Sequence, residues 1–258
     1  MSFDLVTLLT GLSSASALFL VASGLSIIFG VTRIVNFAHG SFYMLGAYIG
    51  YTLILQLGDT SVGFWGAVLI AAVAVGLVGV IMEVTLLRRI YQAPELFQLI
   101  ATFGVILVIQ DVAQWIWGNQ DKVGRDAPGL DGSVTIGGRL LPTYDLALIA
   151  AALLVLAGLW LLFNKTRWGT MVRAATQDRQ MVAALGVDQR WLFTGVLFLG
   201  SALAGLGGAI QVPKGGADLL MDFGILAEAF VVVVVGGMGS ITGAFLAAMI
   251  IGLLGTLG

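Results

Sequence analysis

The stretch VGFWGAVLIAAVAVGLVGVIMEVTLL, residues 62–87, contains a single charged residue, Glu83. A helix needs about 20 apolar residues to cross the ~30 Å hydrocarbon core of a bilayer. This stretch is long enough, and it ends at the basic pair Arg88 and Arg89. It therefore predicts a transmembrane helix, and the rest of the chain repeats its character.

The composition carries the same signal through all 258 residues. Hydrophobic residues make up 59% of the chain and charged residues 10%, against roughly 25% charged residues in soluble domains. Twelve basic and 14 acidic side chains cannot cover a soluble surface of this size. This disfavours a soluble enzyme, a nucleic-acid binder and a disordered chain. The chain has no cysteine and one histidine, His39, which argues against a disulfide, a thiolate nucleophile and a metal site.

Other apolar segments of spanning length flank the first one. We expect a single all-α polytopic membrane domain over residues 1–258, in contact with membrane lipid and not with nucleic acid. A weak turn signal, Gly137-Gly138 after residues 134–136, suggests a small hairpin in the longest polar stretch, residues 118–142. The further predicted spans are residues 5–29, 38–55, 96–117, 144–163 and 191–212, followed by shorter apolar segments at 225–235 and 241–258.

Lysine and arginine are retained on the cytoplasmic side of membrane proteins, so their positions predict the orientation. With the basic loop 164–190 placed inside, eight of the twelve basic residues fall inside and the N-terminus falls outside. The eight are Arg33, Arg88, Arg89, Lys165, Arg167, Arg173, Arg179 and Arg190.

Two places interrupt the helical pattern near opposite ends of the chain, one at residues 33–41 and one at 236–244. Interrupted helices at matching positions of two halves are a sequence sign of an inverted repeat. Irregular backbone at membrane depth survives only where protein or water surrounds it, so both breaks predict a translocation pathway. A tight turn with close glycine packing is the alternative. The candidate pathway residues are Asn36, His39, Gly40, Ser41, Gly236, Gly237, Gly239 and Ser240.

Three carboxylates lie within or beside apolar segments. Glu228 is expected to open the short helix after Gly224, either as a pathway residue or as a helix cap. Asp111 is expected near the outer end of its span, either facing a cavity or at the interface. Glu83 lies about one turn from Arg88 and is expected at the membrane interface.

The basic loop 164–190 contains one amphipathic pattern. Residues 170–185 alternate apolar and polar positions with helical spacing, and Gly186 is suited to end the helix. Such a helix could lie on the lipid surface or dock into a groove on a cytoplasmic partner, and the pattern leaves both open.

Three motifs in these regions resemble one known family. They are GVTRIVNFAHG (30–40) with MLGAY (44–48), GTMVRA (169–174) with Asp178 and AALGV (183–187), and GGMGSITGA (236–244). They are similar to motifs of the branched-chain amino-acid ABC transporter permeases of the LivH type, in the same order along the whole chain.

The resemblance implies the transmembrane subunit of a type II-like ABC importer, with an inverted repeat and broken helices, in the bacterial inner membrane with a periplasmic N-terminus. It implies a second, LivM-like permease, two cytoplasmic ATPase subunits and a periplasmic substrate-binding protein. Since the chain has no phosphate-binding GxxxxGK[ST] motif, we expect no catalytic residue and no cofactor in it, with ATP and Mg on the partner subunits. It also implies a further C-terminal helix beyond Gly258. The expected ATPase-coupling residues are Arg173, Ala174, Asp178, Ala183, Leu185 and Gly186.

The family resemblance implies branched-chain amino acids as substrates, while related permeases carry urea, short amides or aromatic acids. A self-sufficient channel or an ion-coupled carrier is the alternative, because Asp111 and Glu228 could bind a coupling ion beside the broken helices. A scaffold without transport activity explains the paired helix breaks less well.

Overall fold

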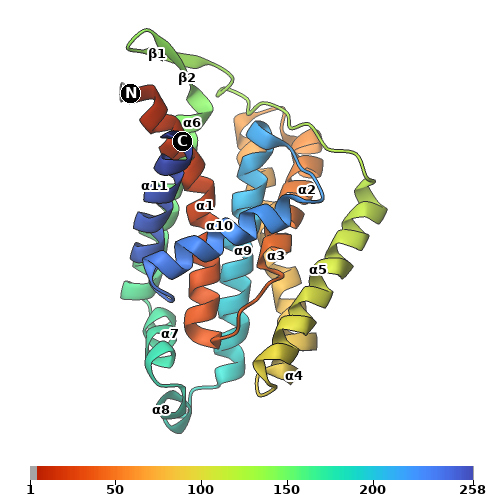
Figure 1. The fold of residues 1–258 in the computed structure, drawn as a ribbon, viewed down its shortest axis with the longest axis vertical. Helices are drawn as coiled ribbons and strands as arrows, with labels where there is room; N and C mark the ends of the chain where they lie inside the picture. Colours follow the sequence, from red (N-terminus) through yellow and green to blue (C-terminus); the bar gives the residue numbers. More distant parts are fainter. Residues whose placement is uncertain (1–4, 258) are drawn as a thin grey trace.

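The computed structural model describes residues 5–257, so the predicted placement of the N-terminus and of the chain end at Gly258 falls on residues outside this range. The named elements of the described part are helices apart from one hairpin, and Figure 1 shows the helices gathered in one bundle. This confirms the predicted all-α polytopic class. The elements are α1 (Leu5–Thr32), α2 (His39–Leu57), α3 (Ser61–Met82), a π-helical turn (Glu83–Leu87), α4 (Arg88–Ile90), α5 (Glu95–Trp117), β1 (Ser133–Ile136), β2 (Arg139–Pro142), α6 (Thr143–Lys165), α7 (Arg167–Gln177), α8 (Arg179–Ala184), α9 (Gln189–Gly215), α10 (Met221–Gly236) and α11 (Ile241–Leu257).

Five helical segments of the described chain are long and apolar enough to cross a membrane. They contain five of the six predicted spans. The sixth, α2, is helical but not among them, because polar or weakly apolar residues occur along its length, including His39, three tyrosines and Gln56. The five segments are Leu5–Thr32, Ser61–Ile90, Glu95–Trp117, Thr143–Lys165 and Gln189–Gly215.

The centre of the bundle is formed by α1, α2 and α9, and α3 packs on the outer side of α9. In the most apolar window of α1, 89% of the residues are buried, although the helix is long and apolar enough to span a membrane alone. In Figure 1, α10 crosses this core obliquely at mid-height, whereas α5 stands at the edge of the bundle. The broken segments are thus packed against the most buried helix.

Glycines allow the central helices to approach closely. A side chain at Gly46 of α2 would collide with the backbone of Gly205 in α9, and one at Gly200 of α9 would come within 2.5 Å of Ile28 in α1. Small residues at helix contacts are the usual means by which membrane helices gain van der Waals contact. Part of the high glycine content therefore serves packing.

Glu83 lies in the protein interior close to the end of the Ser61–Ile90 segment, and its expected depth at the membrane interface stays a prediction. It is fully buried and opens the π-helical turn. Arg88 pairs with its carboxylate at 2.9 Å, and Thr194 of α9 donates to the same carboxylate at 2.8 Å. The π-helical turn lies between the two ion-pair partners, and π-turns are often found at such special sites.

The predicted amphipathic helix is two helices, which is a correction. Asp178 adopts an extended conformation (φ −145°, ψ 103°) and separates α7 from α8. Its side chain accepts a hydrogen bond from the Met181 amide at 3.0 Å, which caps α8. An aspartate that caps a new helix competes with continuation of the old one.

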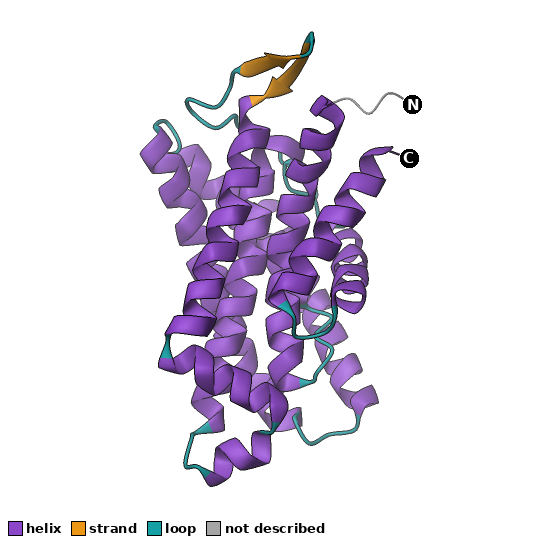
Figure 2. Cartoon of the chain, turned by 90° about the vertical axis from the view of Figure 1, so that its left-hand side faces the viewer, coloured by secondary structure: helices purple, strands orange, loops and turns teal. Residues whose placement is uncertain are grey.

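The weakly predicted hairpin is present and lies at the opposite end from α7 and α8 (Figure 2). Strands β1 and β2 pair antiparallel, with Ser133 opposite Pro142 and Ile136 opposite Arg139. Gly137 and Gly138 connect them with φ values of 58° and 83°. Positive φ at both positions is characteristic of a two-residue type I′ turn.

The Glu83 cluster gives a stability prediction. We expect Glu83→Ala to lower the free energy of unfolding by about 2–3 kcal/mol, because it leaves Arg88 and Thr194 without their buried acceptor. Unfolding of the purified chain in mixed micelles with increasing SDS measures this. The control is Asp59→Ala, which breaks an ion pair with Arg125 whose side chains are 74% and 52% exposed. The control should cost less than about 1 kcal/mol, and equal losses would contradict a special role for the buried cluster.

Candidate functional site

The first helix break begins where α1 ends. Arg33 has a φ of 55°, a value rare for residues other than glycine, and it turns the chain out of α1. The Thr32 hydroxyl donates to the Ile28 carbonyl at 2.8 Å and accepts from the Ile34 amide at 3.3 Å. Residues 33–38 then return toward the bundle as non-helical chain, and α2 begins at His39.

Asn36 and His39 are fully buried at this break. The Asn36 side-chain oxygen accepts a hydrogen bond from the Ala38 amide at 3.1 Å, which shapes the turn before α2. The His39 ring contacts the Val21 carbonyl of α1 through Nε2 at 2.9 Å. Among the described residues, the Asn36 amide nitrogen and His39 Nδ1 lack a hydrogen-bond partner. The His39 ring therefore packs the break against α1, whereas the hydrogen bond of Asn36 lies within the break.

The next two residues connect the break to α10. A side chain at Gly40 would collide with the Asp222 carbonyl oxygen, so only glycine permits this approach. Ser41 donates to the Asp222 carboxylate at 3.0 Å. Gln110 of α5 donates to the same carboxylate at 3.1 and 3.2 Å.

Sequence reasoning did not single out Asp222. Asp222 is 2% exposed and joins α2, α5 and α10. An acidic residue in the first turn of a helix, beside aromatic and aliphatic residues, is the signal that could have indicated it. The neighbouring Asp111 faces outward from α5 and is exposed.

The second break is a glycine turn between α10 and α11. Gly237 and Gly239 have φ values of 89° and 88°, which residues with a Cβ atom rarely adopt. Ser240 accepts a hydrogen bond from the Gly243 amide at 3.0 Å and caps α11. Gly236 and Gly243 face each other without room for a side chain on either.

This turn is held against α1 by two contacts. The Ser26 hydroxyl accepts from the Gly239 amide at 3.1 Å and donates to the Ser240 carbonyl at 3.5 Å. A side chain at Gly30 would come within 2.8 Å of the Gly239 α-carbon. We call Ser26, Gly30, Gly239 and Ser240 the α1 clasp. The clasp fixes the position of the second break along α1.

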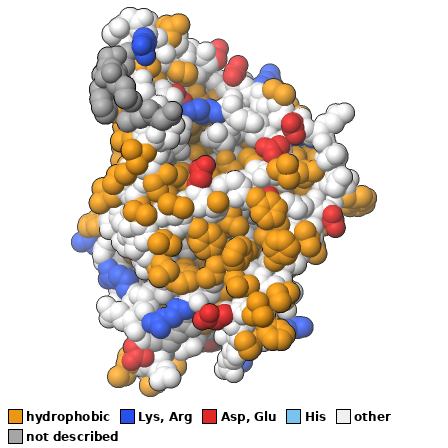
Figure 3. All heavy atoms as spheres, in the orientation of Figure 1, with side chains coloured by type: hydrophobic (Ala, Val, Ile, Leu, Met, Phe, Trp, Pro, Cys, Tyr) orange, Lys and Arg blue, Asp and Glu red, His pale blue; other side chains and the backbone are white. Residues whose placement is uncertain are grey.

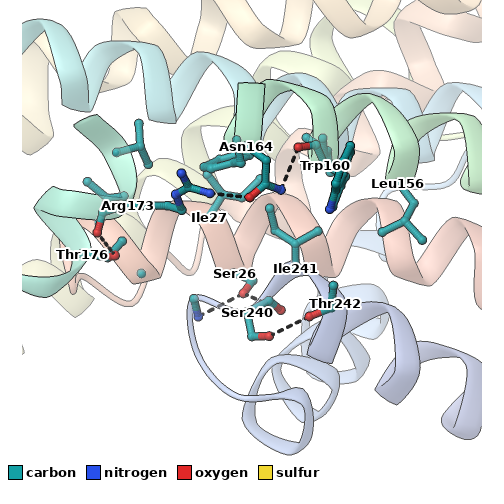
Figure 4. Close-up of a pocket in the computed structure, with 16 residues that line it drawn as sticks. Ser26, Ile27, Leu156, Trp160, Asn164, Arg173, Thr176, Ser240, Ile241 and Thr242 are labelled. Atoms are coloured by element: carbon teal, nitrogen blue, oxygen red, sulfur yellow. Dashed lines mark hydrogen bonds between the residues drawn. The ribbon is translucent and has the colours of Figure 1, made fainter. Parts of the chain in front are cut away.

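A cavity of about 260 Å³ lies beside the clasp, between α1, α6, α7 and the start of α11. Figure 4 shows Ser26 and Ile27 on one side of it and Arg173 and Thr176 of α7 on another. Arg173 donates a hydrogen bond to the Asn164 side chain at the end of α6. The second break and α7 are therefore neighbours at one end of the bundle.

All six predicted coupling residues are exposed on α7, α8 and the following turn. The opposite face of α7 is buried through Gly169, Val172 and Ala175, so the pair of helices presents one face outward. Two large apolar side chains belong to this outward surface, Met181 at 59% and Leu185 at 76% exposure. We call the exposed residues of 173–186 the coupling surface.

Glu228 is the eighth residue of α10 and does not lie at its start, because the helix begins at Met221. This corrects the expectation that Glu228 opens the helix, and the first-turn acid is Asp222. Glu228 lines a separate cavity of about 270 Å³ between α1, α2, α9 and α10, to which Asp111 does not contribute. Figure 3 shows that hydrophobic side chains form most of the middle of the face that carries α10.

Comparison with known proteins covers nearly the whole chain. The sequence model of the family described as "Branched-chain amino acid transport system / permease component" matches residues 7–258. The chain is 28% identical to the high-affinity branched-chain amino acid transport system permease protein BraD of Pseudomonas aeruginosa, over 95% of this chain and 83% of that protein. No solved structure matches significantly.

A second bacterium and an archaeon also contain similar proteins. The high-affinity branched-chain amino acid transport system permease protein LivH of Escherichia coli K12 is 26% identical, over 97% of this chain and 84% of that protein. The probable branched-chain amino acid transport permease protein LivH of Methanocaldococcus jannaschii is also 26% identical, over 93% and 76%.

The α1 clasp gives a prediction that needs no functional assay. Ser26→Ala removes the acceptor for the Gly239 amide, and one such hydrogen bond contributes about 1 kcal/mol. We therefore expect amide hydrogen exchange in residues 237–243 to accelerate about fivefold, measured by mass spectrometry. Ser23→Ala is the control, because the buried Ser23 hydroxyl bonds only the Leu20 carbonyl of its own helix. If both variants exchange like the unmodified chain, the clasp does not hold the turn.

Proposed function

Because this chain belongs to the family of branched-chain amino acid transport system permease components, we propose that it is the transmembrane subunit of an ATP-driven importer for branched-chain amino acids. The observation that carries the proposal is the position of the coupling surface beside the second helix break. The printed names of the relatives support the substrate class, since they are branched-chain amino acid permeases.

The proposed assembly contains a second, LivM-like permease, two cytoplasmic ATPases and a periplasmic binding protein. ATP and Mg would be held by the ATPases. In this chain the coupling surface supplies the docking face for an ATPase, and its exposed Met181 and Leu185 support that role. Helices with an exposed apolar stripe commonly dock into a groove of a partner.

A continuous set of contacts leads from the coupling surface to the membrane interior. α7 packs against α1 with the Thr176 methyl group near Gly30, and Gly30 contacts Gly239 of the second break. The break begins α11 and ends α10, and α10 contacts the first break through Phe37 and Phe230, whose ring centroids are 5.5 Å apart. We propose that ATP-driven movement of α7 and α8 shifts α10 through the α1 clasp.

The pathway in this proposal runs along the two helix breaks. It includes Asn36, His39, Gly40 and Ser41 of the first break, Gly236, Gly237, Gly239 and Ser240 of the second, and Glu228 between them. The contacts of both breaks with α1 and α10 support their joint role. We propose that the two breaks belong to inverted halves of a type II-like fold.

We further propose that α7 and α8 face the cytoplasm of a bacterial cell and that the hairpin and the N-terminus face the periplasm, across the inner membrane. The basic residues support this orientation. Arg88, Arg89 and the basic loop lie at the end of the bundle that carries α4, α7 and α8, whereas the hairpin lies at the other end (Figure 1). Positive residues concentrate on the cytoplasmic side of such proteins.

The coupling surface gives the main functional test. In the assembled importer, Leu185→Asp should reduce leucine uptake and leucine-stimulated ATP hydrolysis about tenfold or more, because a carboxylate replaces an apolar contact at the docking face. Thermal stability of the isolated chain should not change, since Leu185 is 76% exposed.

Val123→Asp is the matched control. Val123 is 86% exposed on the long polar segment before the hairpin, so uptake should be unaffected. If Leu185→Asp is as active as Val123→Asp, the coupling assignment is wrong.

The second break gives a further prediction about transport. Gly239→Leu should lower leucine uptake at least tenfold, because a side chain at φ 88° is strained and would press on Gly30. Co-purification of the partner subunits checks that the complex still forms. Gly104→Leu on α5 is the control, since no atom lies within 4 Å of the added carbon. Normal uptake by an assembled Gly239→Leu complex would remove this break from the pathway.

A further inference from the structure

Four polar side chains from four helices converge on the cavity beside Glu228. Ser14 comes from α1, Tyr43 from α2, Gln211 from α9 and Glu228 from α10. The cavity has a volume of about 270 Å³ and opens to the surface of the chain. This volume lies near the lower end for small-molecule sites, which begin at roughly 300 Å³.

None of these four side chains makes a hydrogen bond or an ion pair with another described residue. The buried carboxylates of the described chain behave differently: Glu83, Asp145 and Asp222 each have polar partners inside the protein. Glu228 differs from them because it is exposed at the surface of the chain, where a carboxylate cannot face lipid at low cost. Glu228 therefore faces water, a partner subunit or a solute.

The rest of the cavity wall is apolar. Ala17 and Leu18 of α1 and Met221 and Ile225 of α10 complete it. The cavity thus offers a carboxylate together with a phenol, an amide and a hydroxyl that can donate hydrogen bonds, beside an aliphatic wall. These are the complements of an ammonium group, a carboxylate and a branched aliphatic side chain.

We infer that this cavity is a transient binding subsite for a free aliphatic α-amino acid during its passage. Glu228 pairs with the ammonium group, Tyr43, Gln211 and Ser14 donate to the carboxylate, and the α1 and α10 side chains hold the aliphatic group. Charge-assisted hydrogen bonds to both ends of a zwitterion fix its orientation. The inference rests on the proposed transport function and deepens it.

The test uses the absence of cysteine from the chain. Ser14→Cys places one thiol at the cavity, and its modification in the assembled complex in lipid nanodiscs is followed by mass spectrometry of this chain. The probes are a cationic and an anionic methanethiosulfonate of similar size. We expect the cationic reagent to react faster, and Glu228→Gln to reduce the ratio of the two rates about tenfold, because it removes the nearby negative charge. Glu228→Asp, which keeps the charge, should preserve most of the ratio.

Ligand protection tests the amino-acid specificity. L-Leucine should slow labelling of the Ser14→Cys chain, whereas 4-methylpentanoate, which has the same aliphatic group and carboxylate but no ammonium, should not. The protection by leucine should disappear with Glu228→Gln. Val123→Cys is the control, because Val123 is 86% exposed on the long polar segment before the hairpin and outside the cavity. Its labelling should respond neither to leucine nor to the Glu228 substitution.

Equal rates for the two reagents, or labelling that leucine does not slow, would overturn the inference. The proposed function is measured separately, as ATP-driven leucine uptake by the unmodified complex. Uptake combined with unprotected labelling removes only the subsite. Absence of uptake of any branched-chain amino acid removes the proposed function itself.

Discussion

A carboxylate buried inside the protein has to find its partners there, and this constraint organises the bundle. The described residues contain three buried carboxylates, and each connects distant parts of the chain. Glu83 joins the end of the third span to α9. Asp145 of α6 pairs with Lys214 of α9 at 2.8 Å and accepts a hydrogen bond from Ser13 of α1. Asp222 joins α10 to α2 and α5. Outside these points the helices contact one another mainly through apolar and small residues, so the polar clusters set which helices are neighbours and at what height.

The two helix breaks use a different kind of contact, in which backbone meets backbone at glycine. Gly40 brings α2 onto the start of α10, and Gly30 brings α1 onto the turn after it. The short helix α10 is therefore attached at both of its ends to elements that also carry the breaks. Glycines have no side chain that could rearrange, so side-chain movement at these contacts cannot absorb a displacement at one end of α10. This arrangement links the end of the bundle that carries α7 to the cavity beside Glu228.

Hydrophobicity and length predicted the spans well, because each spanning helix needs enough apolar residues of its own to cross the hydrocarbon core. Lys and Arg positions likewise predicted which loops share an end of the bundle. Side-chain contacts between residues far apart in the sequence could not be predicted from these patterns. The contact of Glu83 with Thr194 was not predicted because the two residues are 111 positions apart, and Asp222 was not singled out because Ser41 and Gln110 lie far away in the sequence. The amphipathic pattern of 170–185 continues through Asp178, so periodicity could not reveal the cap that divides it. The same limit hid Ser14, Tyr43 and Gln211, whose common cavity is created only by the packing of four helices.

The contact between Gly30 and Gly239 has a mechanical consequence. Helices normally interlock through ridges of side chains that fit into grooves, and such ridges resist sliding and rotation. Two glycines present smooth backbone, so this contact limits how closely α1 and the turn approach but offers little resistance to rotation of one against the other. The two segments can therefore rotate against each other at this contact. Among the described contacts here, the Ser26 hydrogen bonds are the ones that oppose this rotation. Breaking a hydrogen bond of this kind costs on the order of 1 kcal/mol. Binding of a partner subunit can supply this free energy.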